Sequence, residues 1–329
     1  MQSYRAPWWL PGGNLQTIYA TLLDRRYRVA YRRERWDTPD GDFIDVDRVD
    51  GQPDKPLVVL FHGLEGNSYS HYATSLMCAV RELGWRGAVV LFRSCSGEIN
   101  RLPRAYHSGD SAEMEWILRR LKAQNPHCAT YAVGVSLGGN VLLKWLGEQA
   151  EKAGKLIKAA VTVSATLDLM VAGDYLGRGF NLFYTRAFLV SMKQKLLQKL
   201  ERFPGLVDRQ AMLCSSTLRQ FDDVVTAPLH GYKNTDDYWT RASSKRVLTN
   251  IRVPTLIIHA KNDPFLPASA LPSPSEVSPL VTLDYPDTGG HAGFVSGMFP
   301  GHLDWLPQRI LEFFNKQSER IDAREALIS

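Results

Sequence analysis

The feature of this sequence that most constrains its fold is the regular alternation of short apolar runs with longer stretches of helical periodicity. Between the apolar runs 56–63 and 87–93, residues 70–85 repeat apolar side chains at helical spacing. Such an alternation builds a parallel sheet that is covered by helices on both faces. The pattern therefore predicts an α/β fold with a mostly parallel central sheet. The other expected elements are a helix at 109–124 and strands at 130–135, 158–165, 254–260 and 280–286.

Two segments depart from this alternation. Residues 31–49 read as an antiparallel hairpin leading into the sheet, with Pro-Asp-Gly at its turn. From about residue 166 to 249 the chain is helical and aromatic without strand signals, and the strand pattern resumes afterwards. We interpret 166–249 as a helical cap inserted over the carboxyl edge of the sheet. Residues 1–165 and 250–329 then form one core, hairpin included.

The segment Val133–Asn140, VGVSLGGN, places Ser136 between two glycines at the end of an expected strand and the start of an expected helix. A sharp strand-to-helix turn strains the backbone of its central residue and needs neighbours without side chains, here Gly134 and Gly138. The turn leaves the hydroxyl exposed, and the helix N-terminus offers free N–H groups and a positive dipole to an oxyanion. This context predicts Ser136 as a nucleophile.

A serine hydroxyl is a weak nucleophile, so it needs a base, and the base needs an orienting acid. Asp263 lies just past the expected strand 254–260, where a carboxylate can point into the site from a loop. His291 follows the last expected strand in the sequence DTGGHAGF, whose glycines let the loop return over the sheet. We expect Asp263 as acid and His291 as base, with Asp168 as the alternative acid. Other histidines fit less well, because they lie in a different loop, inside a strand or beyond a Pro-Gly turn: His62, His259 and His302.

The tetrahedral intermediate of acyl transfer needs two donors for its oxyanion. The loop FHGLEGN, residues 61–67, follows an early strand and is placed to lend one backbone N–H group. The residue after the nucleophile lends the other. We assign these donors to Leu64 and Leu137, and we expect His62 to support the loop rather than to transfer protons.

With these pieces in order, the sequence resembles the α/β-hydrolase superfamily, and within it the YheT-like branch of bacterial hydrolases related to the eukaryotic abhydrolase-domain lipid esterases. The resemblance implies an α/β-hydrolase fold, ester hydrolysis, and Ser136, Asp263 and His291 as nucleophile, acid and base. Many members of the branch carry a histidine where this chain has Asn14. The motifs that carry the resemblance are APWWLPGGNLQT, LFHGLEGNS, LFRSCSGEINRLPRAYHSGD, GVSLGGN, LRQFDDVVTAPLHGYKNTDDYW, PTLIIHAKNDPF and GGHAGF.

Three classes of function remain open at this point. The first is a serine esterase that forms an acyl-enzyme on acyl-chain-bearing substrates, because the expected cap is rich in Leu, Phe and Tyr. The second is an acyltransferase that uses the same acyl-enzyme with an acceptor other than water. The third is a non-catalytic binding protein, which is disfavoured because every catalytic position is filled. A serine at position 136 argues against dehalogenases and epoxide hydrolases of this fold, which use an aspartate.

Composition limits the partners. Lys and Arg number 39 against 34 Asp and Glu, with no long run of like charge, so nucleic-acid binding is not expected. No metal constellation and no dinucleotide fingerprint is present, so no cofactor is expected. Neither a signal-peptide apolar region nor a run of eighteen apolar residues is visible, which favours the cytoplasm, and no protein partner is inferable. Reduced thiols are expected at four widely spaced positions, Cys78, Cys95, Cys128 and Cys214.

Residues 188–203 of the expected cap place apolar side chains on one face of a helix and basic ones elsewhere. This helix could contact a membrane peripherally, but packing against the core is the favoured interpretation. Asp222 and Asp223 are expected to serve the cap rather than to bind metal, because no His or Glu clusters with them. A structural hydrogen-bonded network is expected among Arg93, Arg104, His107 and Asp110.

Overall fold

The computed structural model of the chain describes residues 4–23 and 26–326. Residues 1–3, which belong to the stretch expected to lack a signal segment, lie outside the described residues. So do 24–25 and 327–329, which belong to the expected core. None of the described helices is long and apolar enough to span a membrane.

An eight-stranded sheet forms the centre of the molecule, in the order β1-β2-β4-β3-β5-β6-β7-β8. The β1–β2 hairpin joins the sheet antiparallel to β4, and all later pairs are parallel. The predicted α/β class with a mostly parallel sheet is therefore confirmed. The strands are β1 Arg32–Asp37, β2 Phe43–Val49, β3 Leu57–Phe61, β4 Arg86–Leu91, β5 Thr130–Val135, β6 Ala159–Val163, β7 Thr255–Ile258 and β8 Val281–Asp284.

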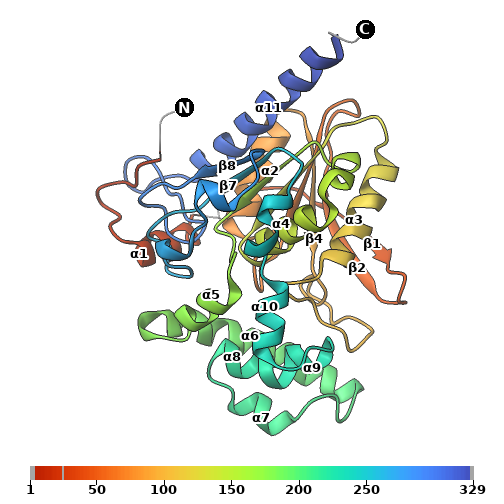
Figure 1. Cartoon of the computed structure of the whole chain (residues 1–329), viewed down its shortest axis with the longest axis vertical. Helices are drawn as coiled ribbons and strands as arrows, with labels where there is room; N and C mark the ends of the chain where they lie inside the picture. The colour runs from red at the N-terminus through yellow and green to blue at the C-terminus, as the bar shows by residue number, and fades with distance from the viewer. Residues whose placement is uncertain (1–3, 24–25, 327–329) are drawn as a thin grey trace.

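Both faces of the sheet are covered by helices, because alternate residues of each strand point to opposite sides. In β3, Val58 and Leu60 pack with α2 and α11 on one face, while Val59 and Phe61 pack with α3 and α4 on the other. All four side chains are completely buried. Figure 1 shows the resulting layers. The helices of the core are α1 Gly13–Ala20, α2 His71–Glu82, α3 Ser111–Gln124, α4 Leu137–Gln149 and α11 Trp305–Ala326.

Six helices lie between β6 and β7, within the segment 166–249, all of which is described and none of which forms a strand. In Figure 1 they extend below the sheet as a separate layer. They have small apolar clusters of their own, such as the one that joins Leu189 and Leu196 to Met212 and Phe221. These helices are α5 Leu169–Leu176, α6 Leu182–Arg202, α7 Arg209–Cys214, α8 Leu218–Phe221, α9 Ala227–Leu229 and α10 Thr235–Ala242, with a π-helical turn at Asp222–Thr226.

Candidate active site

Ser136 lies at the turn between β5 and α4 in a conformation that non-glycine residues rarely adopt, with φ 53° and ψ −117°. Its backbone N–H donates to the Val163 carbonyl at the end of β6, at 2.9 Å. A Cβ atom on Gly134 would lie 2.6 Å from the Gly138 carbonyl oxygen, and one on Gly138 would lie 2.6 Å from the His62 carbonyl oxygen. Both positions therefore require glycine.

Asp263 and His291 are brought together although 28 residues separate them. His291 Nδ1 lies 2.9 Å from Asp263 Oδ2 and 3.1 Å from Oδ1. Burial by itself raises the pKa of Asp263, but the charge of His291 and hydrogen bonding by the neighbouring imidazoles outweigh it and hold this pKa below its usual value. An ionised carboxylate in this position fixes Nδ1 as the protonated nitrogen of His291 and leaves Nε2 free to accept a proton.

A second imidazole lies against the same carboxylate, and the sequence did not point to it. His259 follows β7 directly and has no exposed surface. Its Nε2 atom lies 3.2 Å from Asp263 Oδ2, and its backbone N–H donates to the Asp284 carbonyl at 3.0 Å. Asp263 is therefore shared by two histidines.

The loop that carries His291 is fixed at the same strand end as the Ser136 turn. Ala292 N–H donates to Ser164 Oγ at 3.0 Å, and Ser164 follows the Val163 carbonyl that accepts from Ser136. The Ser136 turn and the His291 loop are thus held by two consecutive residues at the end of β6, Val163 and Ser164. Within the described part of the chain the Ser136 hydroxyl has no hydrogen-bond partner, His291 included. Catalytic hydrogen bonds are often loose without substrate.

Helix α1 holds this loop from the other side, a role that the sequence analysis missed. Thr17 Oγ1 accepts from the His291 N–H at 2.8 Å, and Gln16 Oε1 accepts from the Gly289 N–H at 2.8 Å. Gln16 Oε1 also accepts from the side chain of Asn262, which borders Asp263. The segment around Gln16 and Thr17, part of a motif singled out in the sequence, therefore fixes the loops of both the expected acid and the expected base.

The expected oxyanion loop lies beside the turn. Among the described residues, the backbone N–H groups of Leu64 and Leu137 have no hydrogen-bond acceptor, so both are free to donate. His62 Nδ1 lies 2.7 Å from the Gly63 carbonyl, and its Nε2 accepts from the Phe92 N–H at 3.1 Å. Burial lowers the pKa of His62 to about 4, so the ring is neutral and supports the loop.

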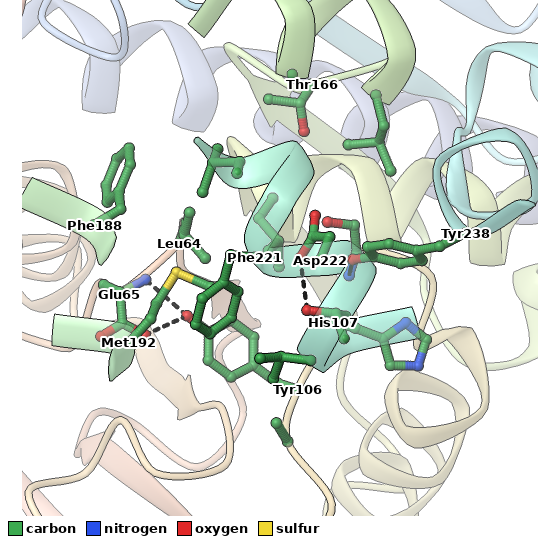
Figure 2. Close-up of a pocket in the computed structure, with 18 of the residues that line it drawn as sticks. Leu64, Glu65, Tyr106, His107, Thr166, Phe188, Met192, Phe221, Asp222 and Tyr238 are labelled. Atoms are coloured by element: carbon green, nitrogen blue, oxygen red, sulfur yellow. Dashed lines mark hydrogen bonds between the residues drawn. The ribbon is translucent and has the colours of Figure 1, made fainter. Parts of the chain in front are cut away.

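A cavity of about 140 Å³ opens between the sheet and the inserted helices, and Ser136, Leu64 and Leu137 lie on its wall. The other walls are mostly apolar: Figure 2 shows Phe188, Met192 and Phe221 from the inserted helices around it. The apolar face expected for 188–203 thus turns partly inward. A cavity with apolar walls and a few convergent polar groups is the usual form of a small-molecule site.

Asp168, the alternative acid, caps helix α5 by accepting from the Val171 N–H at 3.2 Å. Asp222 accepts from Trp239 Nε1 at 2.8 Å and from Thr226 Oγ1 at 2.6 Å, while Asp223 accepts from the Thr235 N–H. Both carboxylates serve contacts within the inserted helices.

The polar residues after β4 form ion pairs that are buried around Arg93 and partly exposed around Arg104. The Arg93 guanidinium, 2 % exposed, pairs with Asp42 at 2.9 Å and with Glu113 at 2.6 Å. Arg104 pairs with Asp110, which also caps α3. Among the described residues, no three His, Cys, Asp or Glu side chains are grouped so as to hold a metal ion.

The fold and its relatives define an α/β hydrolase of the esterase and lipase type. The sequence profile of the α/β hydrolase fold family matches residues 56–297, and the chain belongs to this family. It is 38% identical over 311 residues to YheT of Escherichia coli (strain K12), whose name assigns it to the esterases; the match covers 93% of this chain and 91% of YheT. It is 28% identical to phospholipase ABHD3 of Mus musculus, covering 97% of this chain and 79% of that protein.

Solved structures share the fold. Est1E from Butyrivibrio proteoclasticus, solved with ferulic acid bound, superposes with a TM-score of 0.57 at 13% identity. The superposition covers 88% of this chain and all of Est1E. The membership in the YheT-like branch that the motifs predicted is confirmed by the sequence relatives.

Proposed function

We propose that the protein hydrolyses carboxylic esters through a serine nucleophile, with Ser136, His291 and Asp263 as catalytic triad. The observation that carries this proposal is the pairing of His291 with the ionised Asp263, next to a strained serine turn fixed at the same strand end. Two free amides, those of Leu64 and Leu137, border the same cavity. The esterase and phospholipase names of YheT and ABHD3 support the same class of reaction.

In this mechanism Ser136 Oγ attacks the ester carbonyl while His291 Nε2 takes its proton. The Leu64 and Leu137 amides donate to the oxyanion of the tetrahedral intermediate. Collapse of the intermediate breaks the ester bond, and the proton on His291 passes to the leaving alcohol. Water, activated by the same imidazole, then releases the acid from the acyl-enzyme. Asp263 keeps the imidazole in the required tautomer and stays ionised throughout.

We further propose that residues 166–249 act as a cap that selects the acyl chain. Helix α6 supports this proposal, because Phe188, Met192 and Leu196 line the cavity that Ser136 borders. Chains that bury more methylene groups in this cavity gain affinity from the hydrophobic effect. We also propose that the protein is located in the cytoplasm and that its cap contacts a membrane peripherally.

Active-site labelling tests the proposal. The protein is incubated with a fluorophosphonate probe and assayed with p-nitrophenyl esters, alongside Ser136→Ala. We expect labelling at Ser136, ester turnover by the parent, and loss of both in a variant that keeps its melting temperature. Labelling at a different serine would reject the triad. Adding an alcohol acceptor to the assay separates hydrolysis from acyl transfer, since only a transferase would favour the new ester over the free acid.

A further inference from the structure

Glu65, the residue after the expected oxyanion donor Leu64, is held in place by contacts at both its backbone and its side chain. Its backbone has a φ of 57°, and its carboxylate is only 9 % exposed. Tyr106 Oη accepts from the Glu65 N–H at 2.9 Å and donates to Glu65 Oε1 at 2.8 Å. Figure 2 shows this hydroxyl between the backbone nitrogen and the carboxylate of Glu65. The contacts fix the backbone directly after Leu64.

The other carboxylate oxygen is held by helix α6 of the inserted segment. Lys195 Nζ lies 2.8 Å from Glu65 Oε2, and the Ser191 hydroxyl donates to the same oxygen. Ser191 and Lys195 are four residues apart, so they lie on one face of the helix. Lys195 also donates to Cys95 Sγ at 3.4 Å. The inserted segment is therefore joined to the oxyanion loop by a hydrogen bond and an ion pair.

Helix α6 also lines the cavity. Met192 and Leu196 each follow one of the two Glu65-binding residues in sequence, and both border the cavity together with Leu64 and Ser136. A chain that occupies the cavity thus presses on the same helix that holds Glu65. A largely buried carboxylate that loses its cation is costly, so the loop cannot keep this arrangement when α6 moves away.

We propose that Glu65 is a positioning residue through which helix α6 sets the oxyanion hole, so that an acyl chain in the cavity raises the rate of the chemical step. The proposal rests on the proposed function, because it gives the Leu64 amide to the oxyanion. Binding energy from a remote part of the substrate is then used in the transition state, which raises kcat rather than only lowering KM.

Lys195→Met tests this coupling, because it removes the cation and keeps most of the side-chain length. Lys193→Met is the matched control: Lys193 lies on the same helix, but its Nζ donates to the Leu213 and Ser215 carbonyls inside the inserted segment. Steady-state kinetics are measured with p-nitrophenyl acetate and p-nitrophenyl octanoate. The affinity for an alkyl trifluoromethyl ketone, whose adduct with the serine places an oxyanion in the hole, is measured in parallel.

For Lys195→Met we expect kcat on the octanoate to fall roughly tenfold with KM within about twofold, since a displaced donor costs less than the hundredfold to thousandfold of a lost one. The kcat advantage of octanoate over acetate disappears, and affinity for the ketone falls by the same factor as kcat/KM. Lys195→Arg restores kcat because it keeps the ion pair. Lys193→Met stays within about twofold of the parent in kcat.

Three results would overturn the proposal: an unchanged kcat in folded Lys195→Met, a rise in KM alone, or an equal loss of kcat in Lys193→Met. If Lys195→Met does not fold, Ser191→Ala carries the test, because it removes one hydrogen bond and keeps the ion pair; an unchanged kcat would then reject the coupling. A parent that labels at Ser136 and hydrolyses esters while Lys195→Met matches it rejects this inference alone. A parent with neither labelling nor turnover rejects the proposed function and this inference with it.

Discussion

The phenyl ring of Phe265 lies face to face with the imidazole of His291, with ring centroids 3.8 Å apart and planes 16° from parallel. The backbone N–H of Phe265 donates to Asp263 Oδ1 at 2.7 Å. Phe265 thus holds the acid with its backbone and the histidine with its ring. It also lines the cavity that Ser136 borders.

Phe265→Leu separates these two functions, because it keeps the N–H group and removes the ring. Ring stacking of this kind contributes about 0.5 to 1.5 kcal/mol, so we expect kcat to fall roughly two- to twelvefold with the fold intact. Ester turnover and melting temperature are the measurements. Phe188→Leu is the matched control, since Phe188 lines the same cavity; equal losses of kcat in the two variants would assign the effect to cavity packing.

Asp263→Asn and Asp168→Asn distinguish the two candidate acids. Asparagine at 263 favours the wrong imidazole tautomer, which costs about 10⁴-fold in kcat in the serine protease triad. Asparagine at 168 still caps α5, because its side-chain oxygen accepts from the Val171 N–H. We expect a loss of several orders of magnitude for Asp263→Asn and a change within about threefold for Asp168→Asn, measured as kcat on one ester. The opposite ranking would move the acid to position 168.

The sheet could be predicted from the sequence because strand positions depend on local apolar patterns. The ends of the strands were predicted less accurately. The strand expected over 158–165 stops at Val163, because Ser164 turns to a φ of 49° and leaves the sheet. The turn around Ser136 and the loops of Asp263 and His291 were readable from local glycine and turn residues. The residues next to them in the sequence are enough to indicate these turns and loops.

The supporting contacts could not be predicted in this way, because they join distant parts of the chain. Gln16 and Gly289 are 273 residues apart, and Ser191 and Glu65 are 126 apart. His259 was set aside because it was expected inside a strand, yet β7 ends at Ile258 and the strand end is what brings His259 to Asp263. Such contacts depend on the sheet order, which local patterns do not specify.

The raised pKa of Asp222 predicts that the free energy of unfolding depends on pH. Burial raises its pKa to about 6 from 3.8, so the folded state binds this proton more tightly than the unfolded chain does. The contribution of Asp222 to the stability of the folded state is therefore most favourable below pH 3.8 and is lost as the pH rises through 6. Above that pH the ionised carboxylate lowers the free energy of unfolding by about 3 kcal/mol.

Asp222→Asn removes this charge and keeps an acceptor for Trp239 Nε1. We expect its melting temperature to exceed that of the parent by several degrees at about pH 7.5 and by much less at about pH 4. Asp223→Asn, at the exposed neighbouring carboxylate, is the control and is expected to show no gain at either pH. A gain of equal size at both pH values in Asp222→Asn would show that the ionisation of Asp222 is not its cause.

If the cavity beside Ser136 holds the acyl chain of the substrate, as proposed, kcat/KM depends on the length of that chain. Each methylene buried there is worth roughly 0.8 kcal/mol, or about fourfold in kcat/KM, until the cavity is full. Ala172→Leu fills part of the wall and is expected to shift the preference to shorter esters. Ala187→Leu, on the exposed side of α6, is the control and leaves the preference unchanged. A flat response of kcat/KM from two-carbon to eight-carbon esters would contradict an acyl cavity.

Leu64→Pro tests the oxyanion hole, because it deletes the backbone N–H that Leu64→Ala keeps. Loss of one such donor costs about 2.7 to 4 kcal/mol in the transition state, or roughly a hundredfold to a thousandfold in kcat. We expect that loss for the proline variant and a much smaller one for the alanine variant. Proline also restricts the loop, so rates are compared only between variants whose melting temperatures match.

If folded Leu64→Pro kept kcat within about threefold of the parent, far short of the loss expected for a deleted donor, the donor would have to be a neighbouring amide, that of Gly63 or Glu65. The Gly63 N–H already donates to Tyr72 Oη, and the Glu65 N–H to Tyr106 Oη, each at 2.9 Å. Either amide would have to break this hydrogen bond before it could donate to the oxyanion.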